Sequence, residues 1–180
     1  IALEKLALSP KDFNILALPP AEMLRSLESG FLDAVSLNPP TLFLAIKKGF
    51  PSILDIGSLV EMRGGGLTVL AKDIKGKPDE VKRVIQAMQS AKDGMRKSKD
   101  KSVELMTRIL KMDRESAAAT YEVFLKTLSL DGVPTRAGIE NLVKSIQAQG
   151  RFVDKKPAFS DLADDRLAKE VAKELGYKVQ

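Results

Sequence analysis

The chain has 180 residues and a formal net charge of +5, and it contains no Cys, His or Trp. The missing residue types exclude a Ser-His-Asp or Cys-His nucleophile, a Cys/His zinc site, a disulfide and a redox thiol. An apolar content of 44% beside 29% charged residues is typical of a globular protein with a core, not of a disordered chain.

Residues 13–40 predict a compact βαβ unit. Continuous apolar runs at Phe13–Leu18 and Phe31–Leu37 favour strands that are buried on both faces. Between them, Pro20 suits the first position of a helix over Ala21–Ser29. Two prolines then end the second strand, because Pro has no N–H to give to a sheet.

The rest of the chain predicts a few short elements and then a run of helices. We expect a helix at Thr41–Lys48 and short strands at Ile53–Ile56 and Leu67–Ala71. Apolar residues then recur with helical spacing, which predicts helices that begin near Asp79, Ser102, Asp113, Thr135 and Asp164 or Asp165. Asp79, Asp113 and Thr135 are the expected N-caps of their helices. The predicted fold class is therefore α/β with a helix-rich C-terminal half.

The ends of the two strands are the first candidate binding site. In a parallel sheet, the strand ends and the N–H groups of the following helices face one crevice, which suits an anionic or polar ligand. The candidates are Leu18, Pro19, Asn38 and Pro39. Leu18 and Pro19 have an ordinary strand-to-helix turn as their alternative, and Asn38 could instead cap the following helix.

A triple glycine, Gly64, Gly65 and Gly66, is the second candidate. It precedes an expected strand and opens no helix, so it does not have the pattern of a dinucleotide-binding or phosphate-binding loop. It could let a ligand approach the backbone, or let two lobes hinge. A flexible crossing loop is the alternative. Capping and surface roles are favoured over acid–base chemistry for the carboxylates of Asp33, Asp55, Asp161, Asp164 and Asp165.

Positive charge gathers in one segment. Residues 72–111 contain twelve Lys and Arg and six Asp and Glu, a net +6. Nucleic acid is not expected as a partner, because residues 51–120 contain no aromatic side chain on which a base could stack. A solvated helical face is favoured, and a helical interaction module is the alternative.

An ordered series of segments carries a family resemblance. It consists of LPPAEMLRSLESGFLDAVSLNPP at 18–40, KKGFPSILDIGSL at 47–59, GGGLTVLAKDI at 64–74 and KPDEVKRVIQAMQSAKDGMRKSKDKSVELM at 77–106. The series resembles the C-terminal part of the periplasmic solute-binding proteins of bacterial ABC importers, within the group that binds nitrate, sulfonates, taurine and thiamine-pyrimidine precursors. The resemblance implies an incomplete type II two-lobe fold. Residues 1–62 would be the remainder of the second α/β lobe, and residues 63–180 would return to the first lobe.

The resemblance also implies a function. The chain would be a non-enzymatic receptor that holds a small organic anion or heterocycle between lobes and presents it to a membrane permease. By family position, the ligand-binding residues would be Leu18, Pro19, Asn38, Pro39 and Gly64–Gly66, with no cofactor and no metal. The location would be periplasmic, or extracellular and membrane-tethered, in a bacterium.

Some expectations concern what lies around this segment. The chain starts without Met, so we treat it as processed or truncated, with any export signal outside it. Exposed sheet edges could then support a homodimer. A pyrimidine-synthase-like enzyme of the same fold is the alternative function, although that chemistry is expected to use histidine.

Overall fold

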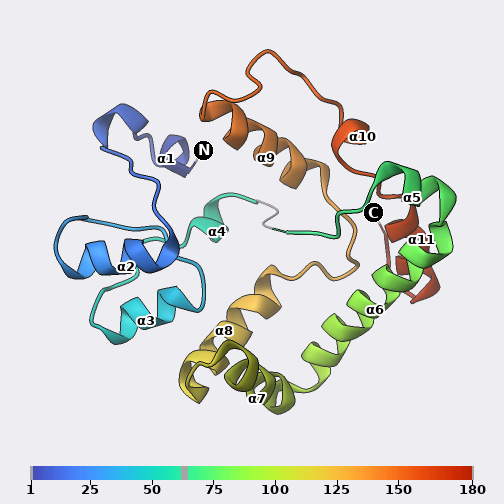
Figure 1. Ribbon diagram of the computed structural model, residues 1–180, viewed down its shortest axis with the longest axis horizontal. Coiled ribbons are helices and arrows are strands. Elements are labelled where there is room, and N and C mark those ends of the chain that lie inside the picture. Colours follow the sequence, from blue (N-terminus) through green and yellow to red (C-terminus); the bar gives the residue numbers. More distant parts are fainter. Residues whose placement is uncertain (1, 62–64, 180) are drawn as a thin grey trace. The chain divides into compact units, whose positions relative to one another are not determined.

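The computed structural model describes residues 2–61 and 65–179, and α-helices dominate this part of the chain (Figure 1). No helix among these residues is long and apolar enough to cross a membrane. The elements in order are α1 (Ala2–Lys5), a 3-10 helix η1 (Pro10–Asp12), α2 (Pro20–Glu28), α3 (Thr41–Lys47), α4 (Ile56–Leu59), α5 (Ala71–Gly76), α6 (Pro78–Lys97), α7 (Lys99–Leu110), α8 (Arg114–Thr127), α9 (Arg136–Ala148), α10 (Phe159–Leu162) and α11 (Arg166–Glu174).

The predicted α/β fold is wrong: residues 2–61 and 65–179 contain no strand and no sheet. The segments expected as strands, Phe13–Leu18, Phe31–Leu37, Ile53–Ile56 and Leu67–Ala71, are irregular or extended, apart from Ile56 and Ala71, which begin α4 and α5. A strand is stabilised by hydrogen bonds to a neighbouring strand, and these segments form no such ladder. Most of their apolar side chains are exposed, as in Ile15 at 66% and Ile53 at 80%. The prediction of a type II two-lobe fold fails for the same reason.

The helix predictions were more accurate than the strand predictions, because a helix forms its backbone hydrogen bonds within its own segment. The helices α2, α3, α6, α7, α8, α9 and α11 lie where the spacing placed them, within a few residues at their ends. Two predicted caps are confirmed: the side chains of Asp113 and Thr135 accept hydrogen bonds from the backbone N–H groups of Ser116 (3.0 Å) and Gly138 (3.2 Å). Asp79 is not a cap, since α6 begins one residue earlier.

The chain forms two compact units. Unit 1 consists of Ile1–Leu8, Asp55–Asp93 and Ser129–Gln180, and unit 2 consists of Ser9–Leu54 and Gly94–Leu128. The predicted division of the chain between residues 62 and 63 stays a prediction, and residues 62–64 lie outside the described residues.

The core of unit 2 lies between α7 and α8, which pack side by side (Figure 1). Its buried residues are Val103, Met106, Ala117 and Tyr121. Tyr121 is 2% exposed, and its hydroxyl donates to the carbonyl of Met95 in the last turn of α6 (3.0 Å). This bond satisfies the polar end of a ring that otherwise fills apolar space.

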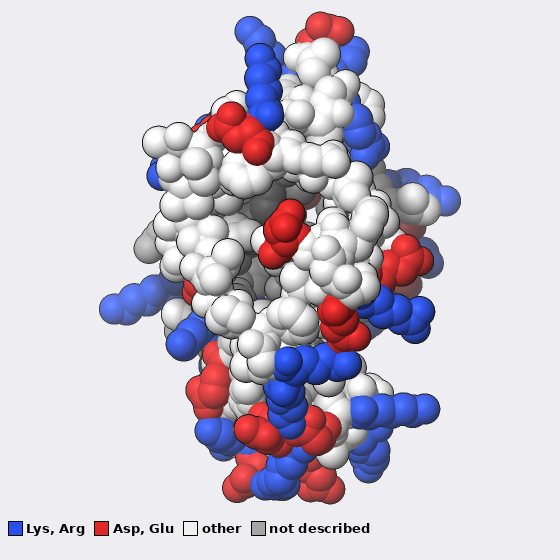
Figure 2. Space-filling view, turned by 90° about the vertical axis from the view of Figure 1, so that its left-hand side faces the viewer, with Lys and Arg blue, Asp and Glu red and all other residues white. Residues whose placement is uncertain are grey.

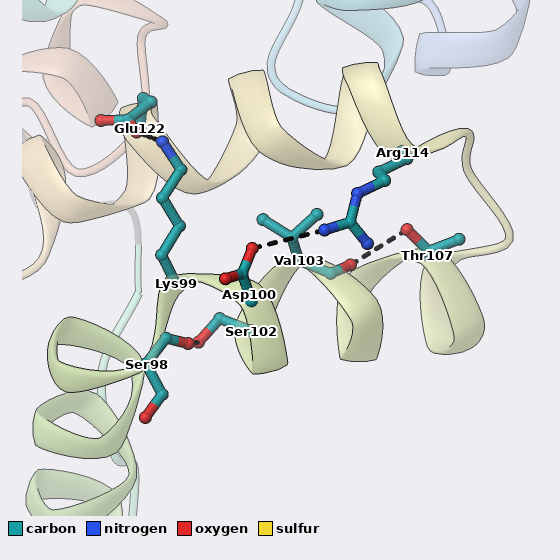
Figure 3. A network of polar contacts seen from close by, with 8 residues as sticks. All are labelled: Ser98, Lys99, Asp100, Ser102, Val103, Thr107, Arg114 and Glu122. Atoms are coloured by element: carbon teal, nitrogen blue, oxygen red, sulfur yellow. Dashed lines mark hydrogen bonds and ion pairs between the residues drawn. The ribbon is translucent and has the colours of Figure 1, made fainter.

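Two ion pairs connect α7 to α8 on the surface of this core (Figure 3). Lys99 Nζ lies 2.6 Å from Glu122 Oε1, and Arg114 Nη2 lies 3.3 Å from Asp100 Oδ1. All four side chains are about half exposed or more, so each pair adds little stability. The buried apolar residues, rather than these pairs, hold the hairpin together.

The core of unit 1 forms where the segment before α9 meets α11. Val133, Ala168 and Ala172 are buried there. Lys82 on α6 lies 2.6 Å from Glu174 and 3.3 Å from Glu170 on α11, which connects α6 to the last helix. The two glutamates lie four residues apart on α11, so the one lysine bridges two adjacent turns of that helix.

Candidate functional site

A groove lies between α2 and α3, the two helices that follow the candidate residues Leu18, Pro19, Asn38 and Pro39. Its volume is about 290 Å³, and all of its lining belongs to unit 2. The lining residues are Ala21, Leu24, Arg25 and Glu28 from α2 and Thr41, Leu44 and Lys48 from the segment of α3. We call this cavity the α2–α3 groove. Three of the seven lining residues are aliphatic, and the other four carry charged or hydroxyl groups.

An ion pair lies where α2 and α3 end along the α2–α3 groove. Lys48 Nζ lies 2.6 Å from Glu28 Oε1. These residues end their helices, whereas Ala21 and Thr41 lie in the first turns, so α2 and α3 run along the groove in the same direction. The other end of the groove therefore lies at the starts of the two helices.

Arg25 supplies the unbalanced charge of the α2–α3 groove. It is exposed, and no carboxylate pairs with its guanidinium among the residues that the structure describes. The other two charges of the lining neutralise each other in the Glu28–Lys48 pair, so the groove carries one net positive charge. A guanidinium presents several N–H donors in a planar fork that matches carboxylate, sulfonate or phosphate oxygens. The groove can therefore hold a small anion with an aliphatic tail.

The helix α3 is fixed to α8 by Lys47. Its Nζ lies 2.6 Å from Asp113 Oδ1 and 3.0 Å from Glu115 Oε2. The hydrogen bond from Lys47, helped by those from the Ser116 N–H and hydroxyl, holds the pKa of Asp113 well below its usual range. The same bonds to Asp113 and Glu115 raise the pKa of Lys47. One carboxylate thus caps α8 and anchors the helix that forms a wall of the groove.

The residues predicted from the strand ends lie next to this groove but do not line it. Leu18 is half-buried and Pro19 is exposed, immediately before α2. Asn38 is exposed and Pro39 is half-buried, just before α3. The Asn38 carbonyl accepts the N–H of Leu42 (3.1 Å), so the backbone of Asn38 contributes to the start of α3. A ligand-binding role for these four residues stays a prediction.

The triple glycine lies only partly within the residues that the structure describes. Gly64 lies outside the described residues, while Gly65 and Gly66 are exposed and have open space around them. Both belong to unit 1, and their role also stays a prediction.

We did not predict Arg25, Thr41 and Lys48 as site residues, because we chose candidates at the ends of expected strands. A signal was present: the lining positions of α2 fall at intervals of three, one and three residues, and those of α3 at intervals of three and four. Such spacing places side chains on one helix face. An aliphatic stripe that carries a single arginine would have indicated the groove without any assumption about a sheet.

The basic segment 72–111 is divided between the two units, and its basic side chains make contacts within each of them. Lys82, Lys99 and Lys77 pair with glutamates, while Lys92 and Arg96 donate to backbone carbonyls. On the face of the protein that Figure 2 draws, Lys and Arg side chains also lie beside Asp and Glu side chains, although no residue of this segment is marked there. This arrangement is typical of a solvated, ion-paired helix surface.

A comparison with known proteins finds a distant relative. The chain is 27% identical over 167 residues to a Bacillus subtilis (strain 168) protein named "Putative aliphatic sulfonates-binding protein". The match covers 91% of this chain and 49% of that protein, so the chain spans about half the length of its relative. No family model matches the chain, and no solved structure gives a significant match.

Proposed function

We propose that the chain is part of the extracytoplasmic solute-binding component of an ABC importer, and that it binds a small organic anion of the alkanesulfonate class in the α2–α3 groove. The observation that carries this proposal is the similarity to a sulfonates-binding protein over nearly the whole chain. The permease of such an importer would be its membrane partner. No chemical step is part of the proposal, because the ligand is released unchanged.

The α2–α3 groove supports this ligand class by its chemistry. The guanidinium of Arg25 would pair with the sulfonate, and Thr41 can donate its hydroxyl to a further sulfonate oxygen. Leu24 and Leu44 would cover the alkyl chain. A volume of about 290 Å³ suits a short chain rather than a long one.

Titration calorimetry of the full chain with methane-, ethane- and butanesulfonate tests the proposal. We expect affinity to rise about fourfold for each added methylene until the groove is filled, since each buried methylene contributes about 0.8 kcal/mol. Methanesulfonamide, which lacks the charge, should bind much more weakly.

Two variants locate the site. Arg25→Gln should lower the affinity about tenfold, because it removes a charged hydrogen-bonding partner. Lys126→Gln removes a charge from α8 outside the groove and serves as the matched control, with no change expected. Absence of binding for every sulfonate would overturn the proposed function, whereas binding that Arg25→Gln leaves unchanged would overturn the location.

A further inference from the structure

Unit 1 contains a second and larger cavity, which the sulfonate proposal does not use. Its volume is about 540 Å³, and it lies among the first turn of α9, the helix α10 and the first turn of α11. We call it the α9–α11 pocket. Residues of three helices therefore line one cavity inside a single unit.

Most charges around the α9–α11 pocket are paired. Arg166 holds Asp164 with two bonds, Nε to Oδ1 at 3.0 Å and Nη2 to Oδ2 at 2.6 Å. Lys169 Nζ lies 2.9 Å from Asp165 Oδ2. The Arg166 guanidinium also lowers the pKa of Asp164, so this carboxylate stays ionised and its pair stays neutral overall at pH 7.

Arg136 is the remaining charge of the pocket. It has no carboxylate partner in the described part of the chain, and its guanidinium lies over the ring of Phe159 at 5.0 Å from the centroid. A cation over an aromatic face is attracted to the ring and held in place by it. The N–H donors at the edge of the guanidinium stay available to a ligand. Asp161, also on α10, accepts the Ala158 N–H (2.8 Å) and does not line the pocket.

We propose that the α9–α11 pocket binds a monovalent organic anion, a carboxylate or a sulfonate with an apolar body, through the guanidinium of Arg136. One unpaired positive charge beside two neutral pairs matches a single negative charge better than a dianion. The space is far larger than an inorganic ion needs, and Phe159, Ala158 and Ala163 offer apolar surface for the rest of the ligand. This site is separate from the α2–α3 groove, so it stands without the proposed sulfonate function.

The test uses isotope-labelled full chain and benzenesulfonate as the probe. Backbone amide signals of Ser160 and Ala163, which line the pocket, report binding there. We expect both signals to shift in a saturable way with benzenesulfonate. Neutral benzenesulfonamide and the dianion 1,3-benzenedisulfonate should bind more weakly.

Substitutions separate this pocket from the α2–α3 groove. Arg136→Gln should weaken binding at Ser160 and Ala163 about tenfold, and Arg136→Lys should restore part of it, because lysine keeps the charge but not the fork. Lys144→Gln, on the exposed side of the same helix, is the control and should leave binding unchanged.

The arginine variant of the other groove separates the two proposals. Arg25→Gln should leave the Ser160 and Ala163 shifts intact. Unshifted signals at these two amides, or equal affinity of the wild type and Arg136→Gln, would overturn the pocket proposal and leave the sulfonate proposal standing.

Discussion

Thr120 on α8 offers a sharp test of how unit 2 is stabilised. Its side chain is 0% exposed, and its hydroxyl has no hydrogen-bond partner in the described part of the chain. Burying a hydroxyl without a partner costs about 1–3 kcal/mol. Thr120→Val replaces that hydroxyl with a methyl group of similar volume, and the two residues have similar helix propensities. We therefore expect the variant to be more stable by about 1 kcal/mol.

Urea unfolding and thermal unfolding, both followed by circular dichroism, measure the change. For a unit of 60–100 residues, about 1 kcal/mol corresponds to a rise of about 4–8 °C in Tm. The matched control is Ser116→Ala, one turn earlier on the same helix. Ser116 is also buried, but its hydroxyl donates to Asp113 Oδ2 (2.8 Å), so its loss should destabilise unit 2. A Thr120→Val protein that is no more stable than the wild type, at an unchanged urea slope, would refute the reasoning.

Three further predictions follow from single contacts. Tyr121→Phe removes the bond to the α6 carbonyl and should lower the free energy of unfolding by about 1 kcal/mol, seen as a lower urea midpoint. The pKa of Asp113 is lowered in the folded state, so its ionised form stabilises the fold at any pH above the ordinary aspartate pKa of about 4. This contribution to stability is lost as the pH falls through the lowered pKa. Asp113→Asn, which can still cap α8, should therefore lose stability at pH 7 and match the wild type more closely in acid; an equal deficit at both pH values contradicts this. Gly132 and Gly150 share a φ of +76°, but an added Cβ meets a buried glutamine oxygen at 3.0 Å only at Gly132, so Gly132→Ala should lower Tm more than Gly150→Ala.

Local signals in the sequence were enough for most of the helices. Asp113 and Thr135 cap helices because their side chains reach N–H groups only three residues away. The spacing of apolar residues likewise placed α7 and α8, because each buries one face against the other. Such information lies within one segment, so it does not depend on how the rest of the chain folds.

The expected strands failed because a sheet is a non-local structure. The runs at Phe13–Leu18 and Phe31–Leu37 have the composition of buried strands, but composition does not supply a partner with which to pair. The same error affected the prediction of the candidate site, because Leu18 and Asn38 were chosen as strand ends. The turns around Leu18 and Asn38 do lie at the starts of α2 and α3, whereas the charge of the groove comes from Arg25, within a helix.

The extended stretch before α2 also decides where the chain can be cut. Proteases take their substrates as extended backbone, and the N–H groups of residues 14–18 make no backbone hydrogen bond to any described residue. A chymotrypsin-like enzyme should therefore cleave after Phe13 or Leu16, both exposed, before it attacks the core hairpin. The resulting nick would leave every element from α2 to α11 on one fragment, which makes limited digestion a direct route to a shorter chain that keeps the α2–α3 groove.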